Sequence, residues 1–237
     1  HLDLPLKIVS IKQDDVVEAV PKLVEAIGSF RAEIIIGGLA TYLVSKSAHK
    51  DGLKTLFFGE SADAIFGGLT KYKQVFFETK SFEAIRKLMV QDQKKLWLNT
   101  FKRLDHFCTS AGIEARAPFV DLDVVANARE LPYDRIVFPN PKFQDKIELR
   151  EIALNYLPEE IAKRKKIAWG RGSGLTIVVK DYVRNNGVIP NQKNVKDFVL
   201  RFESEFIYFD IWKTHYKGLA KDVKELVARD FLPQSQA

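Results

Sequence analysis

The chain has 237 residues, of which 46% are hydrophobic and 29% are charged, a composition typical of a globular protein that can bury a substantial core. No stretch approaches the roughly 20 uncharged apolar residues that a membrane span requires, and the start lacks the basic-then-apolar layout of a secretion signal, so we expect a cytoplasmic protein. The net charge of +6 favours an anionic partner, whether a nucleotide, a nucleic acid or an acidic protein.

Two single residues, Cys108 and His1, bear further on the possible kinds of protein. The only cysteine, Cys108, excludes an internal disulfide and a multi-cysteine metal site. Its apolar neighbours favour a packed side chain over a nucleophile. The sequence begins with His1 and not with methionine, which leaves room for further residues upstream.

The first predicted elements alternate between strand and helix. Residues 6–11 (LKIVSI) have the pattern of a strand, and residues 14–27 have helical apolar spacing that ends at Gly28. Residues 34–36 are too short a run to classify. Residues 39–48 predict a second helix.

A second strand is predicted at residues 54–58, after a turn at Asp51-Gly52. Alternation of this kind predicts an α/β fold with a partial parallel sheet flanked by helices, in which ligands bind beyond the carboxyl ends of the strands. The rest of the chain should be mainly helical, with helical patterns at residues 82–110, 121–129, 143–156 and 175–187. Residues 195–216 carry a wide apolar face that should pack on the domain or on a partner.

The stretch FFGESADAIFGGLTKYK, residues 57–73, places Glu60 and Asp63 just beyond the second strand. In a purely structural interpretation Gly59 ends the strand, Asp63 caps the next helix and Glu60 is solvated. In a functional interpretation the carboxylates serve a hard cation such as Mg2+ beside a phosphate, and the glycines let the backbone approach that phosphate.

This stretch resembles the Gly-Glu-Gly-Ser-Asp-Glu-(apolar)-Phe-Gly-Gly signature of the synthetase domain of the asparagine synthetase family. Residues 103–105 (RLD) then lead into residues 111–121 (AGIEARAPFVD), which resemble the family's Gly-(apolar)-Glu-Ala-Arg-x-Pro-Phe-(apolar)-Asp run. A third series follows in the family's order, namely Lys146, Leu149-Arg150, Leu157-Pro158 and Arg164-Lys165-Lys166. The resemblance covers about residues 6–174 and extends to β-lactam and carbapenam synthetases.

The resemblance implies an adenine nucleotide alpha hydrolase-like fold and an AMP-forming ligase that uses ATP and Mg2+. In this chemistry a carboxylate attacks ATP, pyrophosphate leaves, and an amine or ammonia takes the acyl group from the adenylate. The implied partners are a small carboxylate, with aspartate as the first candidate, and ammonia or a separate glutaminase subunit. Residues 1–174 would be an N-terminally incomplete synthetase domain and residues 175–237 a mainly helical extension, with the oligomeric state left open.

The resemblance also implies roles for residues of the first motif. Asp63 would bind Mg2+ on the pyrophosphate, and Phe58 and Gly59 would contact the nucleotide through backbone groups. Glu60 would accept a proton from the attacking nitrogen. Because the β-lactam-forming relatives have a tyrosine there, Glu60 favours an ammonia-using enzyme.

The later motifs supply the remaining candidates. Glu114 and Arg116 should point the same way in an extended segment, where they either form a stabilising salt bridge or, by resemblance, Glu114 orients the nucleophile or the acid-base partner. By resemblance Lys166 would neutralise charge on the adenylate and pyrophosphate, and Arg164 would contact the nucleotide. The basic run at residues 163–174 is also compatible with a solvated loop or a nucleic-acid patch, although Trp169 is its only aromatic residue.

The departures from the family pattern matter as much as the matches. Ala64 stands where the family has a second acid, and Ile36 where an arginine is expected. The family's Ser-Gly-Gly-x-Asp-Ser phosphate loop is absent from the sequence. Residues 36–41 (IGGLAT) imitate that loop without its serine and aspartate, so we reject them as a phosphate site. Cys108 lies mid-chain, so the sequence contains no glutaminase half with an N-terminal nucleophilic cysteine.

Three hypotheses remain. The first is an ATP-dependent amide-forming ligase whose phosphate loop precedes His1, with intramolecular β-lactam formation as a variant suggested by Gly-Ser-Gly at residues 172–174. The second is a non-catalytic relative that acts as an interaction or regulatory subunit. The third and least favoured is a nucleic-acid-binding protein. The first hypothesis predicts that Glu60, Asp63, Glu114 and Lys166 line one cleft.

Overall fold

The computed structural model describes residues 2–138, 144–167, 172–185, 194–195, 198–200, 202–216 and 218. The chain folds into two compact units, each built from segments that are distant in the sequence. The first unit contains residues up to 7, residues 55–101 and residues 115–166, and the second contains residues 8–54, residues 102–114 and the described residues from 167 onward.

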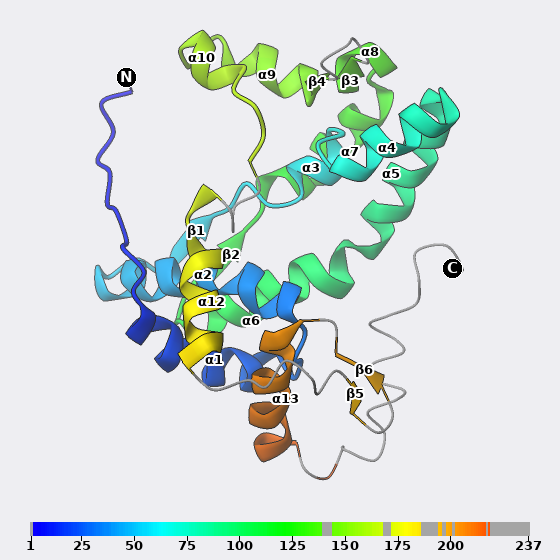
Figure 1. Ribbon diagram of the computed structural model, residues 1–237. Helices are drawn as coiled ribbons and strands as arrows, with labels where there is room; N and C mark the ends of the chain where they lie inside the picture. Colours follow the sequence, from blue (N-terminus) through cyan, green and yellow to red (C-terminus); the bar gives the residue numbers. More distant parts are fainter. Residues whose placement is uncertain are drawn as a thin grey trace. The chain divides into compact units, whose positions relative to one another are not determined.

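The second unit is built around packed helices (Figure 1). Its elements are α1 (Gln13–Ile27), α2 (Ala32–Lys50), α6 (Lys102–Ser110), α12 (Leu175–Asn185), the short strands β5 (Asn194–Val195) and β6 (Phe198–Val199), and α13 (Glu203–His215). In α1, Val16, Val20, Leu23 and Ile27 recur on one face and are all buried. Gly28 ends the helix with φ 64°, a left-handed conformation that glycine adopts without steric cost. The predicted first helix is therefore confirmed.

The apolar face of α13, which belongs to the stretch predicted at residues 195–216, packs within this unit. Trp212 of α13 is 2% exposed, stacks on Phe209 and meets the ring of Phe30 edge-on. Its indole Nε1 donates a hydrogen bond to the Gly28 carbonyl at 3.0 Å, so the buried polar atom of this large apolar side chain is satisfied. Packing on the same chain is thus confirmed for this face, and α12 lies where a helix was predicted.

The stretch that imitates a phosphate loop lies inside α2. A Cβ added to Gly38 would fall 1.7 Å from Cε2 of Phe107, and one added to Gly37 would fall 2.8 Å from Nη1 of Arg103. These glycines therefore let α6 approach α2 closely. Ile36 packs against the apolar core of the unit. The structure confirms that this stretch is not a glycine-rich phosphate loop.

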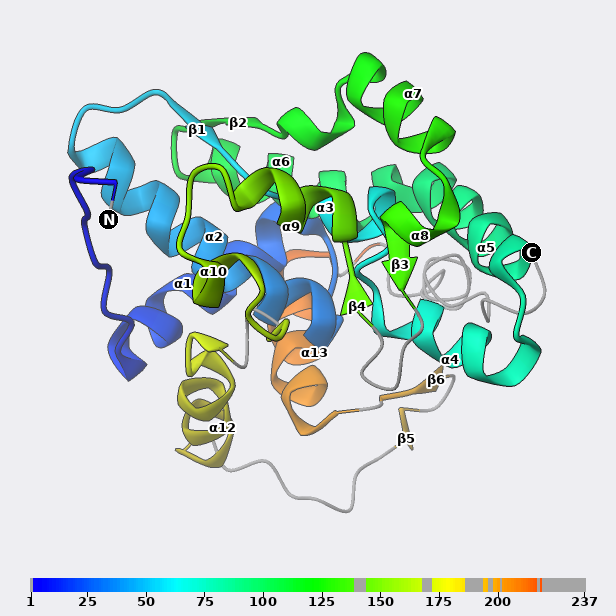
Figure 2. The same ribbon diagram turned by 90° about the horizontal axis from the view of Figure 1, so that it is seen from above.

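The first unit contains two longer helices, α4 (Thr70–Thr79) and α5 (Phe82–Leu96), and many short elements (Figure 2). The short elements are β1 (Thr55–Phe57), α3 (Ala62–Ile65), the π-helix η1 (Trp97–Phe101), the 3-10 helix η2 (Pro118–Val120), α7 (Leu122–Glu130), α8 (Tyr133–Ile136), β3 (Val137–Phe138), β4 (Gln144–Asp145), α9 (Ile147–Ala153) and α10 (Glu159–Ala162). Helices α4 and α5 pack against each other, and α3 contacts α5 and α7. Strands β3 and β4 pair antiparallel.

The predicted fold class is confirmed. Strand β1 pairs in parallel with β2 (Glu114–Arg116) in a small two-stranded sheet, and helices make up most of the described chain. The backbone N–H of Phe58 donates to the Arg116 carbonyl at 2.8 Å, which extends this pairing by one residue. The second predicted strand therefore exists, with a short partner that is distant in the sequence.

The strand predicted at residues 6–11 is wrong. These residues have no regular secondary structure, and Leu6 and Ile8 are 83% and 79% exposed. A strand needs a paired neighbour for its backbone groups, and none of the described strands pairs with this segment. Local apolar pattern alone was not enough to form the element.

The helical patterns of the middle of the chain are largely confirmed. Residues 82–110 form α5, η1 and α6, and residues 121–129 correspond to α7, whose first turn is capped by the Asp121 side chain. The pattern at 143–156 starts too early, because Lys146 has φ 52° and the helix α9 begins only after it. Phe143, at the start of that prediction, lies outside the described residues.

Cys108 is a packed side chain, as predicted. It is fully buried, and the Ser45 hydroxyl lies 3.5 Å from its sulfur. Burial raises the pKa of the thiol, which keeps it in the weakly nucleophilic neutral form. Across the part of the chain that the structure describes, no helix combines the length and apolar character needed to cross a membrane.

Candidate active site

The centre of the candidate site is the carboxylate of Asp63, held between two lysines of the first unit. Lys146 Nζ lies 2.9 Å from Oδ1, and Lys166 Nζ lies 2.7 Å from Oδ2. Lys166 also donates to the Gly68 carbonyl at 2.6 Å. Three residues that are distant in the sequence, from the first motif and the third motif series, therefore meet in one cluster, which we call the Asp63 cluster.

Arg150 of α9 orders the segment that carries Lys166. Its guanidinium donates to the backbone carbonyls of Ala162 and Arg164, at 3.0 and 2.9 Å, and to the backbone and side chain of Asp145, at 2.7 and 2.8 Å. The planar, multiply donating guanidinium suits such a clamp better than an ammonium group would. Sequence reasoning noticed Arg150 as a motif residue but gave it no role.

Lys146 is the other residue that sequence reasoning left without a role. It sits immediately before α9 in a left-handed conformation, with φ 52°, and its ammonium reaches back to Asp63. A lysine in that conformation is uncommon and carries a cost of about 1 kcal/mol or more. The signal that could have found it was its position in the same motif series as Lys166.

Gly68 makes the close approach of these groups feasible. A Cβ at this position would lie 2.5 Å from Oδ1 of Asp63, 3.1 Å from the Asp63 backbone and 3.0 Å from Cδ of Lys146. The neighbouring Gly67 has φ 79° and packs against Ile136. The second Gly-Gly pair of the chain thus shapes the polar site itself.

The electrostatics of the Asp63 cluster favour an anionic ligand. Burial alone would raise the pKa of the Asp63 carboxyl, but hydrogen bonds from Lys166 and Lys146 outweigh it and the pKa is lowered. One carboxylate between two ammonium groups leaves one positive charge in excess. Asp63 remains about one third exposed, so a ligand can reach the cluster.

The carboxylate oxygens available in the Asp63 cluster limit how Mg2+ can be bound. Asp63 is the only carboxylate of its cluster, Ala64 replaces the family's second acid, and no group of three potential metal ligands occurs among the residues that the structure describes. Mg2+ in nucleotide sites is commonly bound through one or two carboxylates together with substrate phosphates. The residues therefore fit a Mg2+ that binds together with a nucleotide, and not an ion held by the protein alone.

The capping interpretation of Asp63 is wrong. The N-cap of α3 is Ser61, and Asp63 is the second residue of the helix, with its side chain committed to the lysines. Ser61 itself has φ 72° and is 7% exposed, and its hydroxyl has no hydrogen-bond partner within the described structure. The family signature has glycine at this position, and that difference is the signal from which this strained residue could have been noticed.

The other predicted residues of the first unit differ in exposure and in the use of their backbone groups. Glu60 is half-buried, and the Arg164 side chain is exposed. The Phe58 N–H is already used in strand pairing, so it is not available to a nucleotide. At Gly59 an added Cβ would meet no described atom within 4 Å, so packing does not require glycine there.

Glu114 belongs to the second unit and begins β2. Its N–H donates to the Lys54 carbonyl at 2.8 Å. Exposed Glu114 and Arg116 flank half-buried Ala115, so the two charged residues share one face of the strand, as predicted. The structure brings Asp63 and Lys166 together, whereas a shared cleft that also includes Glu60 and Glu114 stays a prediction.

Comparison with known proteins agrees with the motif pattern. The family model described as asparagine synthase matches residues 1–104 and 78–188, which together cover most of the chain. A putative glutamine-hydrolyzing asparagine synthetase of Methanocaldococcus jannaschii is 27% identical over 227 residues, covering 84% of this chain and 41% of the relative. Asparagine synthetase B of Escherichia coli is 30% identical over 161 residues, covering 66% of this chain and 27% of the relative.

The matched region spans less than half the length of these curated relatives. The family model nevertheless covers well over half of this chain, including the Asp63, Lys146 and Lys166 motifs. The chain therefore belongs to the asparagine synthase family.

Proposed function

We propose that this chain is the acid-activating part of an ATP-dependent ligase that forms an amide through an acyl-adenylate. The observation that supports this proposal is the Asp63 cluster, in which Asp63 of the first family motif meets Lys146 and Lys166 of the third motif series. An excess positive charge on a partly exposed cluster suits a ligand whose phosphates gain or redistribute negative charge during reaction. Residues 1–174 would carry this activity, and residues 175–237 would be an extension of the domain.

The two lysines would act on the phosphates. In the first step a carboxylate oxygen of the substrate bonds to the α-phosphorus of ATP while the bond to pyrophosphate breaks. Lys166 and Lys146 are flexible ammonium donors, and both contact the Asp63 carboxylate. Shifting these hydrogen bonds from the carboxylate to phosphate oxygens would place positive charge where negative charge accumulates. Mg2+, when bound with the nucleotide through Asp63, would supply further charge neutralisation.

Glu60 would act in the second step. The nitrogen of ammonia or an amine bonds to the acyl carbon, AMP leaves, and the nitrogen loses a proton that the Glu60 carboxylate accepts. Glu60 immediately precedes α3, the helix that bears Asp63. Glu114 would orient the nucleophile or the acid-base partner, and Phe58, Gly59 and Arg164 would contact the nucleotide, Phe58 through groups other than its N–H. Relatives named glutamine-hydrolyzing asparagine synthetases support aspartate as the carboxylate, with ammonia free or supplied by a glutaminase.

Separate assays of the two steps test this proposal in the natural full-length polypeptide. Asp63→Asn should abolish exchange of labelled pyrophosphate into ATP, because it removes the charge that orders both lysines and binds the metal while preserving side-chain size. Glu60→Gln should leave exchange largely intact and slow product formation from ammonia. Equal loss of both activities in Glu60→Gln would rule out its role as the base.

A non-catalytic role is the competing proposal, and Ala64 is the observation that favours it. Loss of the family's second acid reduces the carboxylates available to a metal. Under this proposal the full-length wild type would show no pyrophosphate exchange with any of a broad panel of carboxylates. Exchange with aspartate alone would instead support the ligase and identify its substrate.

A further inference from the structure

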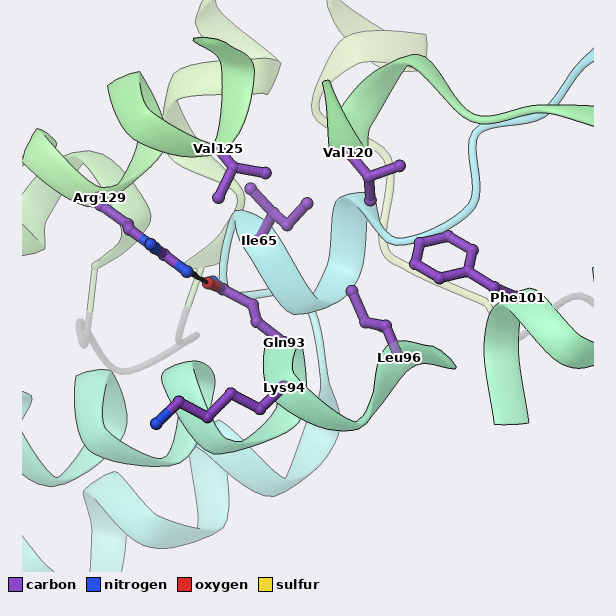
Figure 3. Close-up of a pocket in the computed structure, with 8 residues that line it drawn as sticks. All are labelled: Ile65, Gln93, Lys94, Leu96, Phe101, Val120, Val125 and Arg129. Carbon is purple, nitrogen blue, oxygen red and sulfur yellow. Dashed lines mark hydrogen bonds between the residues drawn. The ribbon is translucent and has the colours of Figure 1, made fainter. Parts of the chain in front are cut away.

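A largely apolar cavity lies in the first unit beside α3. It is formed by residues outside the Asp63 cluster. Its volume is about 200 Å3, and Figure 3 shows its lining, which comes from α3, α5, η1, η2 and α7. The apolar walls are Ile65, Leu96, Phe101, Val120 and Val125, and the polar residues are Gln93, Lys94 and Arg129. None of these residues has a place in the proposed reaction.

The π-helix η1 helps to form the apolar end of this cavity. Leu96 and Phe101 are five positions apart, which on a regular α-helix would separate them by about 140° around the axis. A π-helix bonds residue i to residue i+5 and so brings positions five apart towards the same side. Both side chains line the cavity. The irregular turn therefore supplies a wall that an uninterrupted α-helix would not.

The polar end carries the cation Arg129, whereas the Lys94 side chain points away from the apolar walls and from Arg129 (Figure 3). In the view of Figure 3, Arg129 and Lys94 lie on one side of Ile65, and Phe101 and Val120 lie on the other. Arg129 donates hydrogen bonds from Nε and Nη2 to the Gln93 side-chain oxygen, at 3.3 and 3.2 Å. This oxygen is a neutral acceptor. Within the described part of the chain, neither Arg129 nor Lys94 forms an ion pair with a carboxylate.

We propose that this cavity is a binding site for a small carboxylate with an apolar tail. The tail would occupy the space among Ile65, Leu96 and Phe101, and the carboxylate would pair with Arg129. A dry apolar cavity of about 150 Å3 is known to accept benzene, so this volume suits a tail of about six carbons. An anion on the guanidinium would pair two ionised groups, whereas the present acceptor is a neutral amide.

A ligand in the cavity would also affect α3, the helix that carries Asp63. Ile65 lies two residues after Asp63 on α3, and Gln93 Nε2 donates to the Ala64 carbonyl at 3.5 Å. A ligand that contacts Ile65 and competes for Arg129 would therefore change the surroundings of α3. This gives the site an observable consequence that does not depend on catalysis.

Hexanoate is the probe that tests the proposal, with acetate and hexanamide as matched controls that lack the tail or the charge. Titration of the 15N-labelled chain should give saturable shifts of the Ile65, Leu96 and Val125 amide signals with hexanoate, and at least tenfold weaker binding of each control. Equal binding of hexanoate and hexanamide, or shifts confined to other residues, would overturn the proposal.

Substitutions separate the two ends of the site. Arg129→Gln should weaken hexanoate binding at least threefold and leave the weak binding of hexanamide unchanged, because only the charge contact is lost. Lys94→Gln should leave hexanoate affinity unchanged, because the Lys94 ammonium points away from the cavity (Figure 3). Arg184→Gln removes an exposed arginine of α12 outside the cavity and should have no effect. Val125→Phe should block hexanoate by filling the cavity, with circular dichroism to verify folding. Unchanged hexanoate affinity in Arg129→Gln would exclude Arg129 as the carboxylate site and refute the proposal.

Discussion

The two Gly-Gly pairs of the chain look alike in sequence and serve different purposes. Gly37-Gly38 lies inside α2 of the second unit, where it lets the Phe107 ring and the Arg103 side chain approach the helix. Gly67-Gly68 follows α3 in the first unit, where Gly68 leaves room for Asp63 and Lys146. In both places glycine permits close approach, and the group that approaches determines whether the result is a packed core or a charged site.

This difference explains why the pair that imitates a phosphate loop is not the candidate site. A phosphate site needs exposed N–H groups or cations, and the backbone of a helix interior has its N–H groups already bonded. The pair at residues 67–68 lies beside two ammonium groups instead. We therefore expect a substitution at Gly37-Gly38 to lower mainly the stability of the fold. A substitution at Gly67-Gly68 should change mainly the ion pairs of Asp63.

Gly38→Ala should have the largest effect on stability. The added methyl would lie 1.7 Å from a carbon of Phe107, which is fully buried and cannot move into solvent. Overpacking of this kind costs about 1–3 kcal/mol and occasionally more. Urea denaturation would measure the loss, and Gly59→Ala, where the added methyl meets no described atom within 4 Å, serves as the control. Equal midpoints for Gly38→Ala and the wild type would contradict the packing role.

Gly68→Ala should change the charged site more than the fold. The added methyl would overlap the Asp63 carboxylate and the Lys146 stem, which are flexible and can move apart, and it would also require a small shift from the Asp63 Cα at 3.1 Å. Because the ion pairs are then weakened, the pKa of Asp63 should rise towards its ordinary value. NMR titration of the Asp63 carboxyl carbon measures this directly. A pKa that stays as low as in the wild type would show that Gly68 does not shape the cluster.

Ser61→Gly should stabilise the protein by about 1 kcal/mol. It relieves a left-handed conformation at φ 72° and removes a buried hydroxyl that has no partner in the described structure. Ser61→Ala removes only the hydroxyl and keeps the strained backbone, so it should gain less. Thermal unfolding of the three proteins distinguishes the two causes. If Ser61→Gly melts below the wild type, the hydroxyl makes a stabilising contact.

The smallest expected effect is on the pH dependence of stability. Because the pKa of Asp63 is lowered in the folded state, its ion pairs contribute stability above its unfolded pKa of about 4, and this contribution is lost as the pH falls through the folded pKa. The stability gap between wild type and Asp63→Asn should therefore narrow from pH 6 to pH 3. Urea midpoints at these pH values measure it, and a gap that widens in acid would contradict the assignment.

Sequence patterns identified most helices and the family, but not the contacts that make the site. Helical periodicity was sufficient for α1 and α7, because capping and apolar spacing are local. The strand predicted at residues 6–11 does not form, because a strand needs a hydrogen-bonded neighbour that local sequence does not specify. Lys146 was missed as a partner of Asp63 because 83 residues separate them. Asp63 and Lys166 were identified through motifs. The buried hydroxyl of Ser61 could be recognised only from its surroundings.

Under the proposed function, phosphates bind at the Asp63 cluster and not at Gly37-Gly38. The most direct measurement is an amide NMR titration of this chain with ATP and Mg2+. We predict saturable shifts of the Asp63 and Gly68 signals, absent in Lys166→Met, with the Gly37 and Gly38 signals unchanged. Shifts at Gly37 and Gly38 without a response at Asp63 and Gly68 would contradict the claim.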